Sequence, residues 1–157
     1  MRTLILALPL VAFAAQAPAL SDVQAALVGA WTGTLEYRDY SEPETSTKRV
    51  KLPTWLTVEA AGADLHLHFV YDDGPGKTVI GNESVHFDAA ATAMLKEGRG
   101  LAIVTGTGTE NDKPVRTQTT WRIGRNILEI LEETAPEGKP LAFRHAYTFV
   151  RATPPAK

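Results

Sequence analysis

Hydrophobic and polar residues alternate along most of the chain after residue 30, which is the pattern of half-buried β-strands. Short stretches rich in Gly, Pro, Asn and Asp, which favour tight turns, separate the alternating segments. The expected strands are 31–40, 46–59, 64–72, 77–89, 92–97, 100–110, 114–124, 126–134 and 140–151. The 92–97 segment is also compatible with a helical turn.

Connections of this length join antiparallel neighbours, so consecutive strands form an up-and-down meander. A flat sheet of this kind would leave two edges and one apolar face in water, and closure removes both problems. The sequence therefore predicts an all-β, up-and-down antiparallel barrel of about eight to nine strands. It forms one domain, residues 20–151, followed by a flexible tail, residues 152–157. A barrel of this size is either filled by side chains or holds one small ligand.

A short helix is expected just before the first strand. In "SDVQAALVG", Ser21 and Gln24 stand in the capping-box relation, and Gly29 favours a stop. The preceding residues, 1–19, have the layout of a secretory signal peptide: a basic start, an apolar run over 4–15 and small residues after it. We therefore expect a periplasmic or secreted protein, with a retained N-terminal anchor as the alternative.

Composition narrows the class of function. The chain has no cysteine, which rules out disulfides, a thiol nucleophile and cysteine-ligated metals. Its 16 basic and 18 acidic residues give a net charge of −2 with no basic block, so nucleic acid and anionic membrane surfaces are poor partners. No later segment is long and apolar enough to span a bilayer as a helix, and no pattern calls for a cofactor.

One stretch, "LVGAWTGTLEY", resembles the opening of lipocalins and related calycin barrels. In those families a short helical turn precedes Gly-x-Trp on the first strand, here Gly29 and Trp31. The resemblance implies a small barrel in which an arginine at the end of the last strand, here Arg151, packs over the tryptophan and closes the barrel. The Thr-Asp-Tyr loop motif of lipocalins is absent, because "RDY" at 38–40 sits on the first strand.

Two histidines lie two positions apart in "DLHLHFVYDDGPGK". They alternate with the apolar residues of their strand, so His66 and His68 are expected to point outward. Two imidazoles on one face can share a metal with a carboxylate, but polar residues on that face are equally typical of a solvated surface. We favour the solvated surface and expect no metal site.

The stretch "NESVHFD" contains the residue types of a catalytic triad. Ser84, His86 and Asp88 alternate on one strand face. Same-face neighbours on a strand are about 7 Å apart, too far for the hydrogen bond between nucleophile and base. These three residues are expected to be surface residues.

The last strand is predicted to carry a histidine, His145, into the interior. There it could bind a ligand, coordinate a haem iron, act as an acid–base group, or be a core histidine satisfied by a threonine or glutamate. Either Glu129 or Glu132 could supply an inner carboxylate. The alternation places Phe143, His145, Tyr147, Phe149 and Arg151 on the inner face, and Arg144, Ala146, Thr148 and Val150 on the outer face.

Three functions fit these patterns. The favoured one is an exported, non-catalytic barrel that binds a small apolar or aromatic ligand in its interior. A second is a filled barrel that acts through its surface as an envelope interaction or stress protein, with Trp55 exposed in the contact patch. A third is a small isomerase or lyase, or a haem binder, that uses His145. The expected ligand-binding residues are Tyr37, Phe69, Trp121, His145 and Tyr147.

Overall fold

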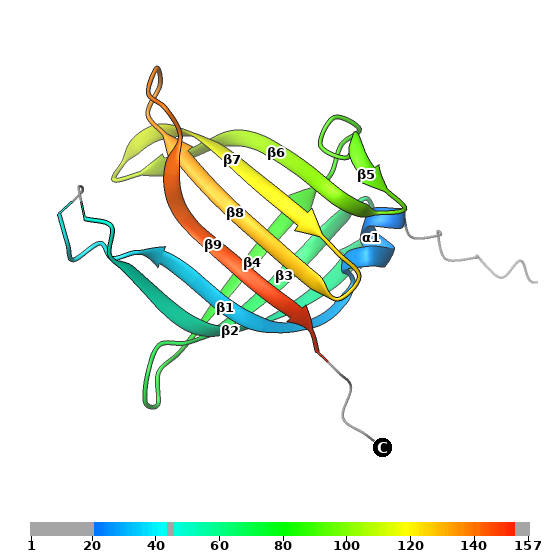
Figure 1. Cartoon of the computed structure of the whole chain (residues 1–157), viewed down its shortest axis with the longest axis horizontal. Helices are drawn as coiled ribbons and strands as arrows, with labels where there is room; N and C mark the ends of the chain where they lie inside the picture. Colours follow the sequence, from blue (N-terminus) through cyan, green and yellow to red (C-terminus); the bar gives the residue numbers. More distant parts are fainter. Residues whose placement is uncertain (1–20, 44–45, 153–157) are drawn as a thin grey trace, which may run out of the picture.

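The computed structural model describes residues 21–43 and 46–152. The predicted signal peptide and the last five residues of the predicted tail lie outside these ranges. Within them the chain forms one short helix and nine strands (Figure 1). The elements are α1 (Asp22–Leu27), β1 (Gly29–Arg38), β2 (Arg49–Ala61), β3 (Asp64–Asp72), β4 (Thr78–His86), β5 (Met94–Lys96), β6 (Arg99–Glu110), β7 (Lys113–Ile123), β8 (Ile127–Ala135) and β9 (Ala142–Arg151).

All nine strands belong to one antiparallel sheet, with the order β4-β3-β2-β1-β9-β8-β7-β6-β5. Consecutive strands are neighbours except β4 and β5, and the first strand also pairs with the last, so the meander curls around a core (Figure 1). The predicted all-β, up-and-down architecture is confirmed. Among the described helices, none has the length and apolar character needed to cross a membrane.

The curled sheet has a seam between its two edge strands, β4 and β5, which do not pair with each other. The segment after β4 covers part of this seam. The backbone N of Ile103 donates to the carbonyl of Ala91 at 3.2 Å, and the Phe87 ring packs edge-on against Trp121 at 5.2 Å. The predicted strand 92–97 is a turn followed by the three residues of β5.

The core lies on the concave face of the sheet, where every second residue of a strand points inward. Trp55, predicted to face outward, is 47% exposed. On the same strand its neighbours Thr54 and Leu56 are both 1% exposed, which follows from the two-residue period. The largest fully buried apolar side chains are Trp31, Phe69, Phe149, Leu27, Leu56, Leu65, Leu67 and Leu128.

Helix α1 covers one end of the curled sheet. Ser21 and Gln24 form a capping box at its start, as the sequence pattern predicts. The Gln24 amide also donates to the carbonyls of Gly62 and Asp64, which ties the helix to the turn between β2 and β3. These contacts fix a short helix that would not be stable by itself.

Trp31 and Arg151 connect the same end of the sheet to the helix. The indole of Trp31 donates to the carbonyl of Leu27 at 2.9 Å. Arg151 places its guanidinium 4.1 Å from the centre of the Trp31 ring and donates to the carbonyls of Ala26 and Val28. The first strand, the last strand and the helix therefore meet at one buried tryptophan, which is the contact that the resemblance to calycin barrels implies.

Candidate functional site

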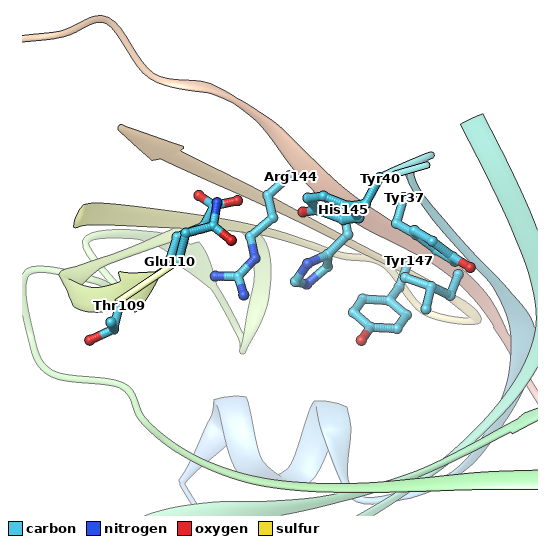
Figure 2. A pocket seen from close by; sticks show the side chains of 9 residues that line it. Tyr37, Tyr40, Thr109, Glu110, Arg144, His145 and Tyr147 are labelled. Atoms are coloured by element: carbon cyan, nitrogen blue, oxygen red, sulfur yellow. The ribbon is translucent and has the colours of Figure 1, made fainter. Parts of the chain in front are cut away.

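A chamber opens at the end of the sheet away from α1. Its volume is about 490 Å³, within the range of small-molecule sites. Strands β1 and β9 and the turn between β6 and β7 form its walls (Figure 2). The lining residues are Leu35, Tyr37, Tyr40, Thr109, Glu110, Asn111, Arg144, His145 and Tyr147.

A smaller inner cavity of about 60 Å³ lies behind this chamber. His145 and Tyr147 line both spaces, so they form the boundary between the chamber and the inner cavity. The inner cavity combines an apolar and aromatic wall with two glutamates and a histidine. Its further lining residues are Leu67, Phe69, Glu83, Val85, Val104, Thr119, Trp121, Ile130 and Glu132.

Arg144 lies inside, where the sequence pattern placed it outside. The pairing of β8 with β9 shifts after Glu132, which faces His145, while Glu133 faces Phe143. One residue of β9 is therefore extra, and such a bulge breaks the strict alternation of side chains. As a result Arg144 and His145, neighbours in sequence, both point into the chamber (Figure 2). Arg144 donates to Glu132 at 3.1 Å.

The same bulge explains why the predicted placement of Phe143 is wrong. This residue was predicted to share the inner face with His145. Its ring instead packs against the guanidinium of Arg49 at 4.5 Å, and Arg49 belongs to the outward set of β2. Because of this one extra residue, Arg144 lines the chamber and Phe143 does not.

His145 is inside, as predicted, and its environment disfavours its charged form. Its Nε2 lies 3.7 Å from a carboxylate oxygen of Glu132, and its ring is edge-on to Tyr147 at 5.2 Å. Burial is the main cause that lowers the pKa of His145, and the charge of Arg144 adds to it, while Glu132 opposes both. Glu132 is therefore the inner glutamate. Glu129 faces outward toward Arg122 at 3.5 Å.

Glu83 is a third titratable residue of the inner cavity, and the sequence reasoning missed it. It pairs across the ladder with the buried Leu67, so its side chain points to the inner face of edge strand β4. It keeps solvent contact there. Burial is the largest cause that raises the pKa of Glu83, followed by the charge of Glu132, and Arg144 acts in the opposite direction. The sequence did contain a signal for this placement, because Glu83 lies two residues before Val85, and residues two positions apart on a strand point to the same face.

Two tyrosines join the walls of the cavity. The hydroxyls of Tyr71 and Tyr147 are 3.0 Å apart and share a hydrogen bond. Tyr147 also stacks on Phe69 with 4.9 Å between ring centres. Burial is the main cause that raises the pKa of both phenols, so both stay protonated over the physiological range.

Trp121 contributes a buried donor. The residue is 3% exposed and lines the inner cavity. Its Nε1 has no hydrogen-bond partner among the residues that the structure describes. Buried indole N–H groups normally have a partner, so this one marks a place where an acceptor is favourable.

The five predicted ligand-binding residues all line one of the two spaces. Tyr37 lines the chamber, Phe69 and Trp121 line the inner cavity, and His145 and Tyr147 line both. Their contact with a ligand stays a prediction. The site adds Arg144, Glu132 and Glu83 to this set, of which only Glu132 was considered as an inner residue from the sequence.

The other histidines lie on the outer surface. His68 shares a hydrogen bond of 2.7 Å with Asn82, and His86 shares one of 2.7 Å with Asp64. Asp88 accepts from the backbone N of Ala91, so it does not join His86 in a triad. Within the described ranges there is no group of three or more His, Asp or Glu side chains that could hold a metal ion.

A row of apolar residues crosses the outer face. Trp55 of β2 pairs with Val70 of β3, which in turn pairs with Ile80 of edge strand β4. Trp55 and Ile80 are 47% and 69% exposed. On the other side of β1 the row continues through Val150 and Ile127, which pair with each other. We call these five residues the outer row; Thr32 of β1, which pairs with both Trp55 and Val150, lies between its two parts.

Comparison with known proteins leaves the architecture and the site as the basis for a functional proposal. Neither a scan against protein-family models nor a search of curated proteins found a match for this chain. The class that the fold defines is a small up-and-down antiparallel β-barrel with a chamber at one end.

Proposed function

We propose that this protein is an exported, non-catalytic barrel that binds one small molecule with an apolar or aromatic body in its chamber. The observation that carries the proposal is the chamber itself: about 490 Å³, lined by the aromatic rings of Tyr37, Tyr40 and Tyr147 together with polar side chains. The signal-peptide pattern of residues 1–19 supports a periplasmic or secreted location.

The shape of the interior supports a bound molecule more than a filled barrel. Near α1 the core is packed, with Trp31 and Phe149 at 1% and 0% exposure. Toward the other end, the side chain of Tyr37 borders the open chamber, and so does Tyr147, whose ring stacks on Phe69. Rigid aromatic walls with polar groups at one end give a ligand both contact area and orientation.

A fluorescent probe tests this proposal. N-phenyl-1-naphthylamine is a neutral aromatic compound whose emission rises in an apolar site. We expect saturable binding by the wild-type protein and at least a fivefold weaker affinity in Tyr37→Ala, which removes part of the chamber wall. Trp55→Ala is the matched control, because it removes an aromatic side chain from the outer row and leaves the chamber intact.

The two variants separate the chamber from the surface. Loss of binding in Tyr37→Ala with wild-type binding in Trp55→Ala supports the chamber. The reverse pattern would place the probe on the outer row and contradict the proposal. Absence of saturable binding in the wild-type protein would contradict it as well.

The second candidate function is action through the surface, and the outer row favours it. Contiguous exposed apolar residues next to a free sheet edge are typical of protein contact sites. This function predicts that Trp55→Ser with Ile80→Ser abolishes capture of a protein partner while chamber variants have no effect. If the protein instead binds a ligand in its chamber, chamber variants should weaken ligand binding, and the two serine substitutions should leave it unchanged.

A third candidate, acid–base catalysis, is favoured by the imidazole of His145, whose Nε2 lies 3.7 Å from the Glu132 carboxylate. A catalyst would turn over a compound that binds in the chamber, and His145→Gln would abolish turnover without weakening binding. A binder returns the same compound unchanged after release, which mass spectrometry of the recovered ligand decides.

A further inference from the structure

We propose that the ligand is a small organic amine whose ammonium group binds in the inner cavity between Glu83 and Glu132, with its apolar body in the chamber. This inference rests on the proposed function, because it names the class of molecule that the chamber receives.

The charges around the inner cavity favour a cation. Glu83 and Glu132 line it from β4 and β8, two strands far apart in the sheet order. Arg144 donates to Glu132, so one of the two carboxylates already has a cation. Glu83 makes no ion pair with any residue in the described part of the chain. Burial lowers the pKa of His145, which disfavours a positive charge on its imidazole. The cavity therefore holds one carboxylate more than cations.

Glu83 is an exposed residue of edge strand β4 and has no cation paired with it among the described residues. Burial and the charge of Glu132 both raise the pKa of Glu83, which means that its ionised form is disfavoured in the free protein. An ammonium group beside it would reverse this, since an opposite charge within a few ångströms favours the ionised form. A carboxylate ligand would instead add a third negative charge and be rejected.

Trp121 is an independent indication of a ligand at the same place. Trp121 lines the same cavity, and its buried Nε1 has no acceptor among the described residues. An ammonium group cannot serve it, because both are donors. The ligand that satisfies the cavity therefore carries an oxygen acceptor within a few atoms of its nitrogen, as a β-hydroxy amine does.

The sizes of the two spaces fix the direction of binding. The inner cavity, at about 60 Å³, holds a polar head of a few atoms and no ring. The chamber of about 490 Å³ has room for an aromatic or aliphatic body beside Tyr37 and Tyr40. The ring of Tyr147 at the boundary adds a favourable surface for a cation.

A series of three compounds of nearly equal shape tests whether the site prefers a positively charged ligand. They are 2-amino-1-phenylethanol, the neutral 1-phenylethane-1,2-diol and the anionic mandelate, each titrated calorimetrically into the wild-type protein at neutral pH. We expect the amine to bind at least tenfold more tightly than the diol, and mandelate to bind most weakly. This comparison needs no variant.

A pair of variants tests whether the ammonium group binds in the inner cavity. Glu83→Gln removes the charge from the inner cavity, and Glu129→Gln removes one from the outer face of β8. We expect Glu83→Gln to weaken the amine at least tenfold and to leave the diol unchanged, whereas Glu129→Gln leaves both unchanged. An equal effect of the two variants on the amine would overturn the assignment to this cavity.

The outcomes distinguish this inference from the proposed function. If the diol or mandelate binds as tightly as the amine, or if the naphthylamine probe binds and none of the three compounds does, the amine assignment is wrong and the chamber remains a binding site. If the probe and all three compounds fail to bind, both proposals are wrong.

Discussion

The guanidinium of Arg151 lies 4.1 Å from the centre of the Trp31 ring, at the point where the last strand returns to the first. The same guanidinium donates to the carbonyls of Ala26 and Val28, so one side chain satisfies the end of α1 and covers the buried indole. This contact holds the packed end of the barrel, and the chamber occupies the other end.

Replacing Arg151 by alanine tests the role of this contact in stability. The change removes two charge-assisted hydrogen bonds and a cation–π contact, so we expect a loss of about 2 kcal/mol in the free energy of unfolding. Arg122→Ala is the control, because its exposed pair with Glu129 should change stability by no more than about 0.5 kcal/mol. Urea unfolding of both variants measures this. Equal losses would contradict the role of Arg151.

A close approach of backbones at Gly33 is a second point on which the fold depends. A Cβ at this position would lie 1.9 Å from the carbonyl oxygen of Thr148 and 2.8 Å from the Cα of Phe149. Because both are backbone atoms, we expect Gly33→Ala to destabilise the protein by about 3 kcal/mol or to prevent folding.

Gly108→Ala is the control for Gly33. Its Cβ would meet two side-chain methyl groups, of Thr117 at 3.3 Å and of Val115 at 3.9 Å, and a small shift relieves the closer contact. We expect a change within about 1 kcal/mol, measured by thermal unfolding. A Gly33→Ala variant as stable as Gly108→Ala would contradict the tight pairing of β1 and β9.

Stability should depend on pH through His145. Its pKa is lowered in the folded protein, so the unfolded chain binds more protons between that pKa and the ordinary value of 6.5. Stability therefore falls as the pH falls through this window. His145→Gln removes the difference, and its melting temperature should change less than that of the wild type between about pH 7 and about pH 5. The exposed His66→Gln should keep the wild-type slope.

The contribution of Glu83 to the pH dependence of stability should have the opposite sign to that of His145. The pKa of Glu83 is raised, so its contribution to stability is complete below the ordinary value of 4.5 and is lost as the pH rises through the folded pKa. Glu83→Gln should therefore stabilise the free protein at pH 7, by no more than about 1 kcal/mol because the group keeps solvent contact. Glu129→Gln should give no such gain. A destabilised Glu83→Gln would show that this carboxylate is not strained.

The alternation of residues was sufficient to predict most of the fold. It placed His66 and His68 outside and His145 inside, because the two-residue period of a strand holds over long stretches. The Gly-x-Trp opening indicated where the first and last strands meet, through Trp31 and Arg151. These features are local or follow from a simple meander.

The site depends on features that the alternation does not contain. Arg144 reaches the chamber only because β9 has one extra residue against β8, and nothing in "AFRHAY" marks that bulge. Glu83 becomes part of the site only when β4 curls opposite β8, which depends on the three-dimensional course of the sheet. The unpartnered donor of Trp121, likewise, is visible only once its neighbours among the described residues are known.

The central claim is that the chamber holds a small molecule, and a native mass spectrum tests it most directly. The protein is purified from its source without unfolding, and its spectrum is compared with that of the denatured protein, before and after incubation with the small-molecule fraction of the same cells. We expect an added mass of a small organic molecule that is lost on denaturation and reduced in Tyr37→Ala. A bare polypeptide mass under both conditions would contradict it.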